Sequence, residues 1–148
     1  MVGVKQALVP ASLLTSVLDG SLLAVDVRPL VVHVLHGLAS AGVERAVVVL
    51  GTGAERIKDS VMQEFVGSEN AKKMKVEFLW GVDVNWGSSL ANNIMAARAA
   101  FSGDEPLLIV RSDYLFDWKL LKMMVNCAFS KGLTVDAYAL VDSNQETL

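Results

Sequence analysis

Two acidic residues, Asp113 and Asp117, follow a continuous apolar run, residues 107–110. If that run is a buried strand, Asp113 lies at its carboxyl end, where a carboxylate is placed to hold Mg²⁺ that bridges nucleotide phosphates. Capping of a turn is the alternative role for Asp113, and the spacing alone leaves the two open. Asp117 comes directly before an expected helix, which favours a role as the N-cap of that helix.

A second polar segment, residues 85–89, precedes another expected helix and contains Gly87, Ser88 and Ser89. Backbone amides at the start of a helix bind anions, so this turn is a candidate contact for a phosphate or a base edge. N-capping by Ser88 or Ser89 is the simpler interpretation of the same residues. Trp86 is more typical of packing surface than of a stacking platform.

The segment after the first expected strand is the place where a glycine-rich loop would bind phosphates. It begins at Pro10, Ala11 and Ser12 and contains neither a G-x-G pattern nor a lysine. Because glycine allows a phosphate to approach the backbone and larger residues do so less well, the sequence disfavours a working phosphate loop here.

The remaining candidate groups favour structural roles. His33 and His36 lie three residues apart on an expected helix, but no third ligand accompanies them, which disfavours a metal site. Cys127 has no histidine or second cysteine beside it and is typical of a small core residue. A short lysine run in a polar loop is typical of a solvated surface: Lys72, Lys73 and Lys75.

The elements that must position these groups alternate along the chain. Expected strands cover residues 6–9, 46–50, 76–80, 107–110 and 134–141. Expected helices cover residues 30–41, 54–65, 90–101 and 118–129, and the second of them places Ile57, Val61, Met62 and Phe65 on one face. This order predicts an α/β fold: a Rossmann-like, doubly wound, mainly parallel sheet of about five strands with helices on both faces. Ligands of such sheets bind beyond the carboxyl ends of the strands.

Composition supports this class and excludes others. The chain has 148 residues, of which 53% are hydrophobic and 20% charged, and this balance excludes intrinsic disorder. The net charge of −3 argues against a general nucleic-acid binder, and the single cysteine excludes an intrachain disulfide. No apolar run approaches the roughly 18–20 residues that cross a bilayer, so we expect no membrane span and a cytoplasmic location.

Three segments together resemble one family. Residues 23–51, the turn Gly87-Ser88-Ser89-Leu90-Ala91 and residues 107–117 (LLIVRSDYLFD) resemble the nucleotidyltransferases that activate sugar phosphates and alcohol phosphates. The form of the last segment is similar to the members that make CDP-alcohols from phosphorylated inositol or choline, which are cytidylyltransferases.

The resemblance implies a nucleotide-diphospho-sugar transferase fold and an activity. A phosphomonoester would attack the α-phosphorus of a nucleoside triphosphate in line and release pyrophosphate, with Mg²⁺ as cofactor. By position in the motifs, Asp113 would be the metal ligand. Gly87, Ser88 and Ser89 would contact the nucleotide, and Ala11 and Ser12 would sit where amides touch the base and phosphates.

Two departures from the family pattern accompany the resemblance. Ser16 stands where the family has an arginine, and its following lysine aligns near Ser21. The chain also ends shortly after residue 141, before the half that supplies the acceptor pocket. We therefore expect residues 1–148 to form one nucleotidyltransferase-like domain, the N-terminal, nucleotide-binding part of a larger fold, that is catalytically weak or inactive.

Other interpretations remain open. The same fold can serve as a non-catalytic regulatory or interaction domain, which the missing arginine and lysine favour. The chain can also form a homo-oligomer in place of the missing half. An unrelated doubly wound domain, such as a flavodoxin-like or receiver module, ranks last because a receiver has an acidic cluster after its first strand. Residues 10–12 supply none.

Overall fold

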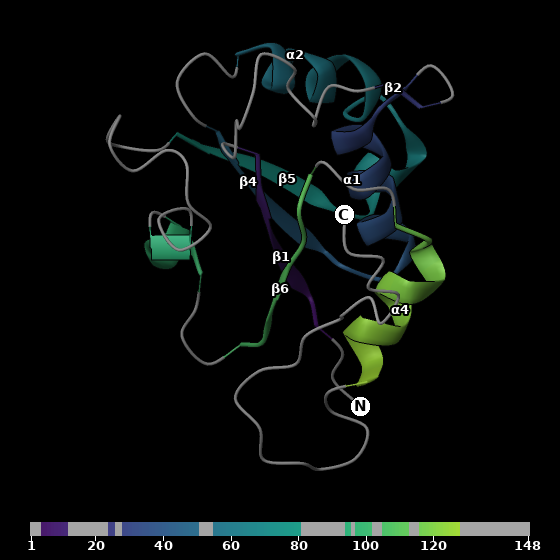
Figure 1. The fold of residues 1–148 in the computed structure, drawn as a ribbon, viewed down its shortest axis with the longest axis vertical. Helices are drawn as coiled ribbons and strands as arrows, with labels where there is room; N and C mark the ends of the chain where they lie inside the picture. Colours follow the sequence, from purple (N-terminus) through teal and green to yellow (C-terminus); the bar gives the residue numbers. More distant parts are fainter. Residues whose placement is uncertain are drawn as a thin grey trace, which may run out of the picture.

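The computed structural model describes residues 4–11, 24–25, 28–50, 55–80, 94–95, 97–101, 105–112 and 116–127. These residues build a four-stranded sheet in the order β5-β4-β1-β6, and every pair of neighbouring strands is parallel (Figure 1). The strands are β1 (Gln6–Pro10), β4 (Arg45–Leu50), β5 (Lys75–Trp80) and β6 (Leu107–Ile109). The predicted fold class is confirmed, and the expected strand at residues 134–141 lies outside the described residues.

The two central strands are buried on both faces, as their sequences predict. All of β1 is buried, and so are the last five residues of β4 (AVVVL). β-Branched side chains pack well on a pleated surface, and strands covered on both faces have continuous apolar runs. The strand β5 is half-exposed along most of its length, which fits its place at the edge of the described sheet.

The first long helix, α1 (Leu30–Ser40), matches the prediction closely at both ends. Pro29 lies immediately before it, at the N-cap position, rather than inside the first turn. Gly42 follows the end of the helix with a φ of +97°, a conformation that glycine adopts without the strain that a side chain introduces. The glycine therefore ends the helix without backbone strain.

The second helix, α2 (Glu55–Glu64), corrects one residue of the predicted apolar face. Ile57 and Val61 are buried, and Phe65 is buried just after the helix, whereas Met62 is 49% exposed. Residues 57, 61 and 65 are spaced by four and form one stripe, and Met62 lies to one side of it. The polar loop that follows contains a 3₁₀ turn, η2 (Glu69–Lys72).

Two hydrophobic clusters cover the two faces of the sheet. The larger one joins the sheet to α1, α2 and α4 (Trp118–Cys127) through Leu35, Ile57 and Leu121, among others. The smaller one packs Ala97, Ile94 and Phe101 over Leu8 and Val49 on the opposite face. Figure 1 shows this arrangement, with α1 and α4 on one side of the sheet and the short green-teal segment near residue 97 on the other. Helices on both faces are thus confirmed.

The structure also contains features that the periodicity did not predict. An antiparallel two-stranded ribbon, β2 (Ala24–Val25) with β3 (Arg28–Pro29), leads into α1. Within the expected helix at 90–101, residues 94–95 and 97 are α-helical and the 3₁₀ turn η4 (Arg98–Ala100) follows. No helix in the described part of the chain has the length and apolar character needed to span a membrane.

Candidate functional site

The strand order defines a single switch point in the described sheet. From β1 the chain passes to β4 and then to β5 on one side, and it returns to place β6 on the other side of β1. At such a point the connections that follow the two strands run to opposite faces of the sheet, and doubly wound sheets bind ligands in the crevice between those connections. The carboxyl ends of β1 and β6 therefore border the position where doubly wound sheets bind ligands.

A short hydrogen-bond network holds these two strand ends together. The Ser112 hydroxyl, in a residue that is 2% exposed, donates to the carbonyl oxygen of Pro10 at 3.2 Å. The amide of Val110 donates to the carbonyl of Leu8 at 3.0 Å, which extends the pairing of β6 with β1 beyond the last strand residue. The edge of the crevice is thus fixed by backbone and buried side-chain contacts.

The amide of Ala11 is engaged at this edge. It donates to the Val49 carbonyl at 2.9 Å, and the residue is buried. This amide, which the resemblance placed against the base and phosphates, is already engaged in the sheet, because the pairing of β1 with β4 continues one residue past Pro10. The contact of Ala11 and Ser12 with a nucleotide stays a prediction.

The other predicted site residues lie outside the described residues: Ser12, Ser16, Ser21, Gly87, Ser88, Ser89 and Asp113. The structure describes the residues that precede two of them in the chain, Ala11 before Ser12 and Ser112 before Asp113, and these described neighbours lie at the ends of the adjacent strands β1 and β6.

Asp117 has the capping role that the sequence favoured. Its carboxylate accepts a hydrogen bond from the Lys119 amide at 2.9 Å, and its carbonyl accepts from the Leu120 amide at 2.9 Å. A side-chain oxygen on one of the first amides of a helix is the defining contact of an N-cap. The predicted cap of α4 is confirmed.

Of the two histidines of α1, His36 contacts residues outside its own helix. Asn70 Nδ2 is 2.8 Å from His36 Nδ1, and the imidazole ring packs against Phe65 with 5.0 Å between ring centroids. In the part of the chain that the structure describes, no group of three or more His, Cys, Asp or Glu side chains is placed to hold a metal ion. His36 thus joins α1 to the segment that follows α2.

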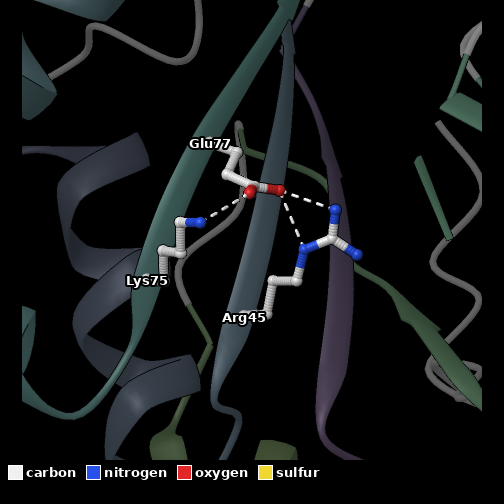
Figure 2. Close-up of polar contacts among 3 residues, drawn as sticks. All are labelled: Arg45, Lys75 and Glu77. Atoms are coloured by element: carbon white, nitrogen blue, oxygen red, sulfur yellow. Dashed lines mark hydrogen bonds and ion pairs between the residues drawn. The ribbon is translucent and has the colours of Figure 1, made fainter.

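An ion-pair cluster at the opposite, amino-terminal end of the sheet was not predicted. Arg45 contacts Glu77 Oε2 through Nε at 2.8 Å and Nη2 at 2.6 Å, and Lys75 Nζ lies 3.1 Å from Glu77 Oε1 (Figure 2). The Arg45 guanidinium hydrogen bond, followed by that of Lys75, holds the pKa of the Glu77 carboxyl below its ordinary value.

Lys75 therefore begins strand β5 rather than lying in the expected loop, while its side chain, 74% exposed, is solvated as the sequence predicted. The sequence contained a signal for this cluster. Lys75 and Glu77 are two residues apart and therefore lie on the same face of β5, and Arg45 is the first residue of the preceding strand, β4. The register that pairs Arg45 with Lys75 is what brings the three charges together.

A pocket of about 270 Å³ lies on the face covered by residues 94–101. Gln6 and Leu107, the first residues of β1 and β6, contribute to its lining together with Arg98 and Phe101. Because the lining includes the amino ends of these strands, the pocket lies away from the crevice at their carboxyl ends. It is a separate feature and not the predicted ligand site.

Solved structures with a similar fold exist. A UDP-glucose pyrophosphorylase complexed with UDP-glucose matches 84% of this chain and 53% of its own length, with 20% identity and a TM-score of 0.64. The fold is that of the nucleotide-diphospho-sugar transferases. HddC from Yersinia pseudotuberculosis, complexed with GMP-PN, matches 79% of this chain with 18% identity and a TM-score of 0.59. The chain spans about half the length of each of these structures (53% and 52%).

Comparisons of the amino-acid sequence identify no family. No protein-family model matches the chain, and no curated protein matches it. The likeness therefore resides in the backbone arrangement, at identities of 20% and below for the structures named above.

Proposed function

We propose that this chain is a nucleotide-binding domain of the nucleotidyltransferase type, which transfers a nucleotidyl group from a nucleoside triphosphate to a sugar phosphate or alcohol phosphate with release of pyrophosphate. The observation that carries the proposal is the neighbouring position of the β1 and β6 ends, joined by the Ser112–Pro10 hydrogen bond. This pairing starts the loop at Ser12 and the acidic segment at Asp113 on the same edge of the switch point.

The donor chemistry at this edge suits Mg²⁺. The cation prefers oxygen ligands and is normally held by one or two carboxylates together with substrate phosphates and water. Asp113 would supply the carboxylate, directly after Ser112, whose buried hydroxyl donates to the Pro10 carbonyl and is engaged in holding the strand ends together. When bound, Mg²⁺ would neutralise charge on the triphosphate. Gly87, Ser88 and Ser89 would bind the nucleotide.

The proposed activity is weak because two cationic positions of the family pattern are serines, Ser16 and Ser21. Cations near a transferring phosphoryl group stabilise the charge of the transition state, and each loss of about 1.4 kcal/mol lowers the rate tenfold. The loss of both positions therefore predicts a rate that is lower by several orders of magnitude than that of a protein with both cations.

The experiment is a thermal-shift and calorimetric screen of CTP, UTP, GTP and ATP with Mg²⁺, in which CTP is expected to bind most tightly. A ligand that binds only the folded state raises the melting temperature by mass action. Asp113→Ala should abolish the Mg²⁺-dependent part of the shift. Glu69→Ala is the matched control, because it removes an exposed carboxylate from η2, near the opposite edge of the sheet. Equal shifts in both variants would refute the assignment of Asp113.

A non-catalytic regulatory domain on the same fold is the second candidate, and Ser16 and Ser21 are the observation that favours it. Pyrophosphate release separates the two. Release from a nucleoside triphosphate and inositol phosphate, choline phosphate or glucose 1-phosphate, lost in Asp113→Ala, supports the transferase. Nucleotide binding without release supports the regulatory domain, and no binding of any nucleotide contradicts both nucleotide-based proposals.

A further inference from the structure

The pocket of about 270 Å³ at the amino ends of β1 and β6 has a mainly apolar lining. Four of its lining residues are hydrophobic: Ile94, Met95, Phe101 and Leu107. The centroid of the Phe101 ring lies 5.3 Å from the guanidinium of Arg45, which Glu77 holds by two contacts (Figure 2). Small-molecule sites combine such a lining with a few polar groups that fix orientation, and this volume suits a molecule below drug size.

The sheet contributes a buried polar side chain to the pocket. Gln6, the first residue of β1, is 4% exposed and pairs in register with Leu107 of β6. Its Nε2 donates to the carbonyl oxygen of Glu105 at 3.3 Å, and no described residue donates to its Oε1. An acceptor without a partner costs free energy when it is buried, so Oε1 would gain from a ligand that brings an N–H donor.

Two opposite charges complete the lining. Arg98 lies in η4 and Glu105 lies two residues before β6, and both residues are exposed. The ion pairs among the described residues join other side chains and include neither of these two. A ligand with one charge would be attracted by one of them and repelled by the other. A small ligand that carries both charges complements both side chains.

An α-amino acid with an apolar side chain combines these properties. We propose that the pocket is a second ligand site for such an amino acid. The carboxylate pairs with Arg98, the ammonium group pairs with Glu105 and donates to Gln6 Oε1, and the side chain packs among the hydrophobic lining residues. Because the pocket lies at the amino ends of β1 and β6, it is separate from the crevice at their carboxyl ends, and the inference does not depend on nucleotide binding.

The first experiment is calorimetry on the full chain without nucleotide or Mg²⁺, with L-phenylalanine and L-leucine as probes. Three analogues each lack one feature: 3-phenylpropionate has no ammonium group, phenethylamine has no carboxylate, and glycine has no apolar side chain. Each should bind at least about tenfold more weakly than L-phenylalanine, the effect of losing one charged hydrogen bond or the apolar contact. In NMR spectra, L-phenylalanine should shift the amides at 94–101 and 105–107.

Substitutions at the two charges test how the ligand is oriented. Arg98→Ala should weaken binding of L-phenylalanine about tenfold. Glu105→Gln should also weaken it, and should narrow the preference for L-phenylalanine over 3-phenylpropionate, because the ammonium group loses its partner while the carboxylate loses a repulsive neighbour. Arg56→Ala and Glu64→Gln are the matched controls, since both residues are exposed on α2, which packs on the opposite face, and both variants should bind like the parent.

The results decide both the site and the ligand class. No binding of L-phenylalanine or L-leucine at about 10 mM would overturn the site, and so would amide shifts confined to residues outside 94–101 and 105–107. Equal affinity for L-phenylalanine and 3-phenylpropionate would overturn the amino-acid assignment. Competition between L-phenylalanine and a bound nucleotide would contradict a separate site. If no nucleotide binds, the proposed function fails while amino-acid binding still supports this inference.

Discussion

Ser112 and Pro10 are 102 positions apart in the chain and are joined by a hydrogen bond of 3.2 Å from the serine hydroxyl to the proline carbonyl oxygen. Ser112 is buried, so neither partner can exchange this contact for water at low cost. The bond ties together the two strand ends that border the candidate site. Its removal is the most direct test of how that edge is held.

Ser112→Ala should lower the free energy of unfolding by about 1–2 kcal/mol, because a buried carbonyl loses its partner. Urea denaturation of parent and variant measures the loss. Ser40→Ala provides the control, since Ser40 is an exposed residue at the end of α1. A loss in Ser112→Ala no larger than in the control would show that the hydroxyl does not hold the strand ends together.

Glu77→Gln should destabilise the fold in a pH-dependent manner. The folded-state pKa of Glu77 lies below its ordinary value of 4.5, so its charge contributes stability above that value. This contribution is lost as the pH falls through the folded-state pKa, where parent and variant should converge. Near neutral pH we expect a difference of about 0.5–1 kcal/mol, the size of a partly exposed ion pair.

Denaturation of both proteins between pH 3 and pH 7, with intervals of about half a unit across the carboxylate range, measures this convergence. Glu44→Gln is the control, because Glu44 forms an exposed ion pair with Lys5. A stability difference for Glu77→Gln that stays constant down to the lowest pH would contradict the assigned role of the carboxylate.

Gly37→Ala should destabilise the contact between α1 and α4. A Cβ atom at Gly37 would lie 3.0 Å from Cδ1 of Leu121, which is buried. Alanine favours a helix more than glycine does, but overpacking a buried contact costs about 1–3 kcal/mol and should outweigh that gain. Thermal unfolding of the parent and of Gly37→Ala shows directly whether the substitution lowers or raises the melting temperature.

Two further variants isolate the steric effect at Gly37. Gly67→Ala meets no atom within 4 Å and should be neutral or slightly stabilising. In a Leu121→Ala background the clash is absent, so Gly37→Ala should there become stabilising. If Gly37→Ala behaves identically in both backgrounds, the Leu121 side chain is not what limits this position.

Asp117→Ala should cost about 1 kcal/mol, because the carboxylate that accepts the Lys119 amide is lost from the start of α4. Asp117→Asn retains a side-chain oxygen and should restore most of that stability. Circular dichroism during urea denaturation measures both variants. Equal losses in the two would indicate that the negative charge, rather than the capping oxygen, stabilises this helix.

Local features of the fold could be predicted from the sequence because they depend on neighbours along the chain. The apolar run of β4, the end of α1 at Gly42 and the cap at Asp117 all follow from periodicity, backbone freedom and short-range hydrogen bonds. Met62 shows the limit of this approach. Met62 belongs to the apolar helical pattern of the sequence, but only a narrower stripe of that helix packs into the core. The side chain of Met62 is therefore about half exposed.

Contacts between distant segments required the tertiary structure. Arg45 meets Glu77 because β4 pairs with β5 in one particular register, and the Ala11 amide is engaged because its strand pairing extends one residue further. Neither fact follows from the identity of the residues, since a register shifted by one position would turn these side chains to the other face.

The sequence by itself determined the alternation of strands and helices, and with it an α/β sheet. Only the tertiary structure decided that β6 lies beside β1, that Ser112 is buried against Pro10, and that the Arg45 guanidinium lies 5.3 Å from the centroid of the Phe101 ring. The physical reason is that secondary structure is specified by local periodicity, whereas strand order and register are set by packing the whole apolar surface at once.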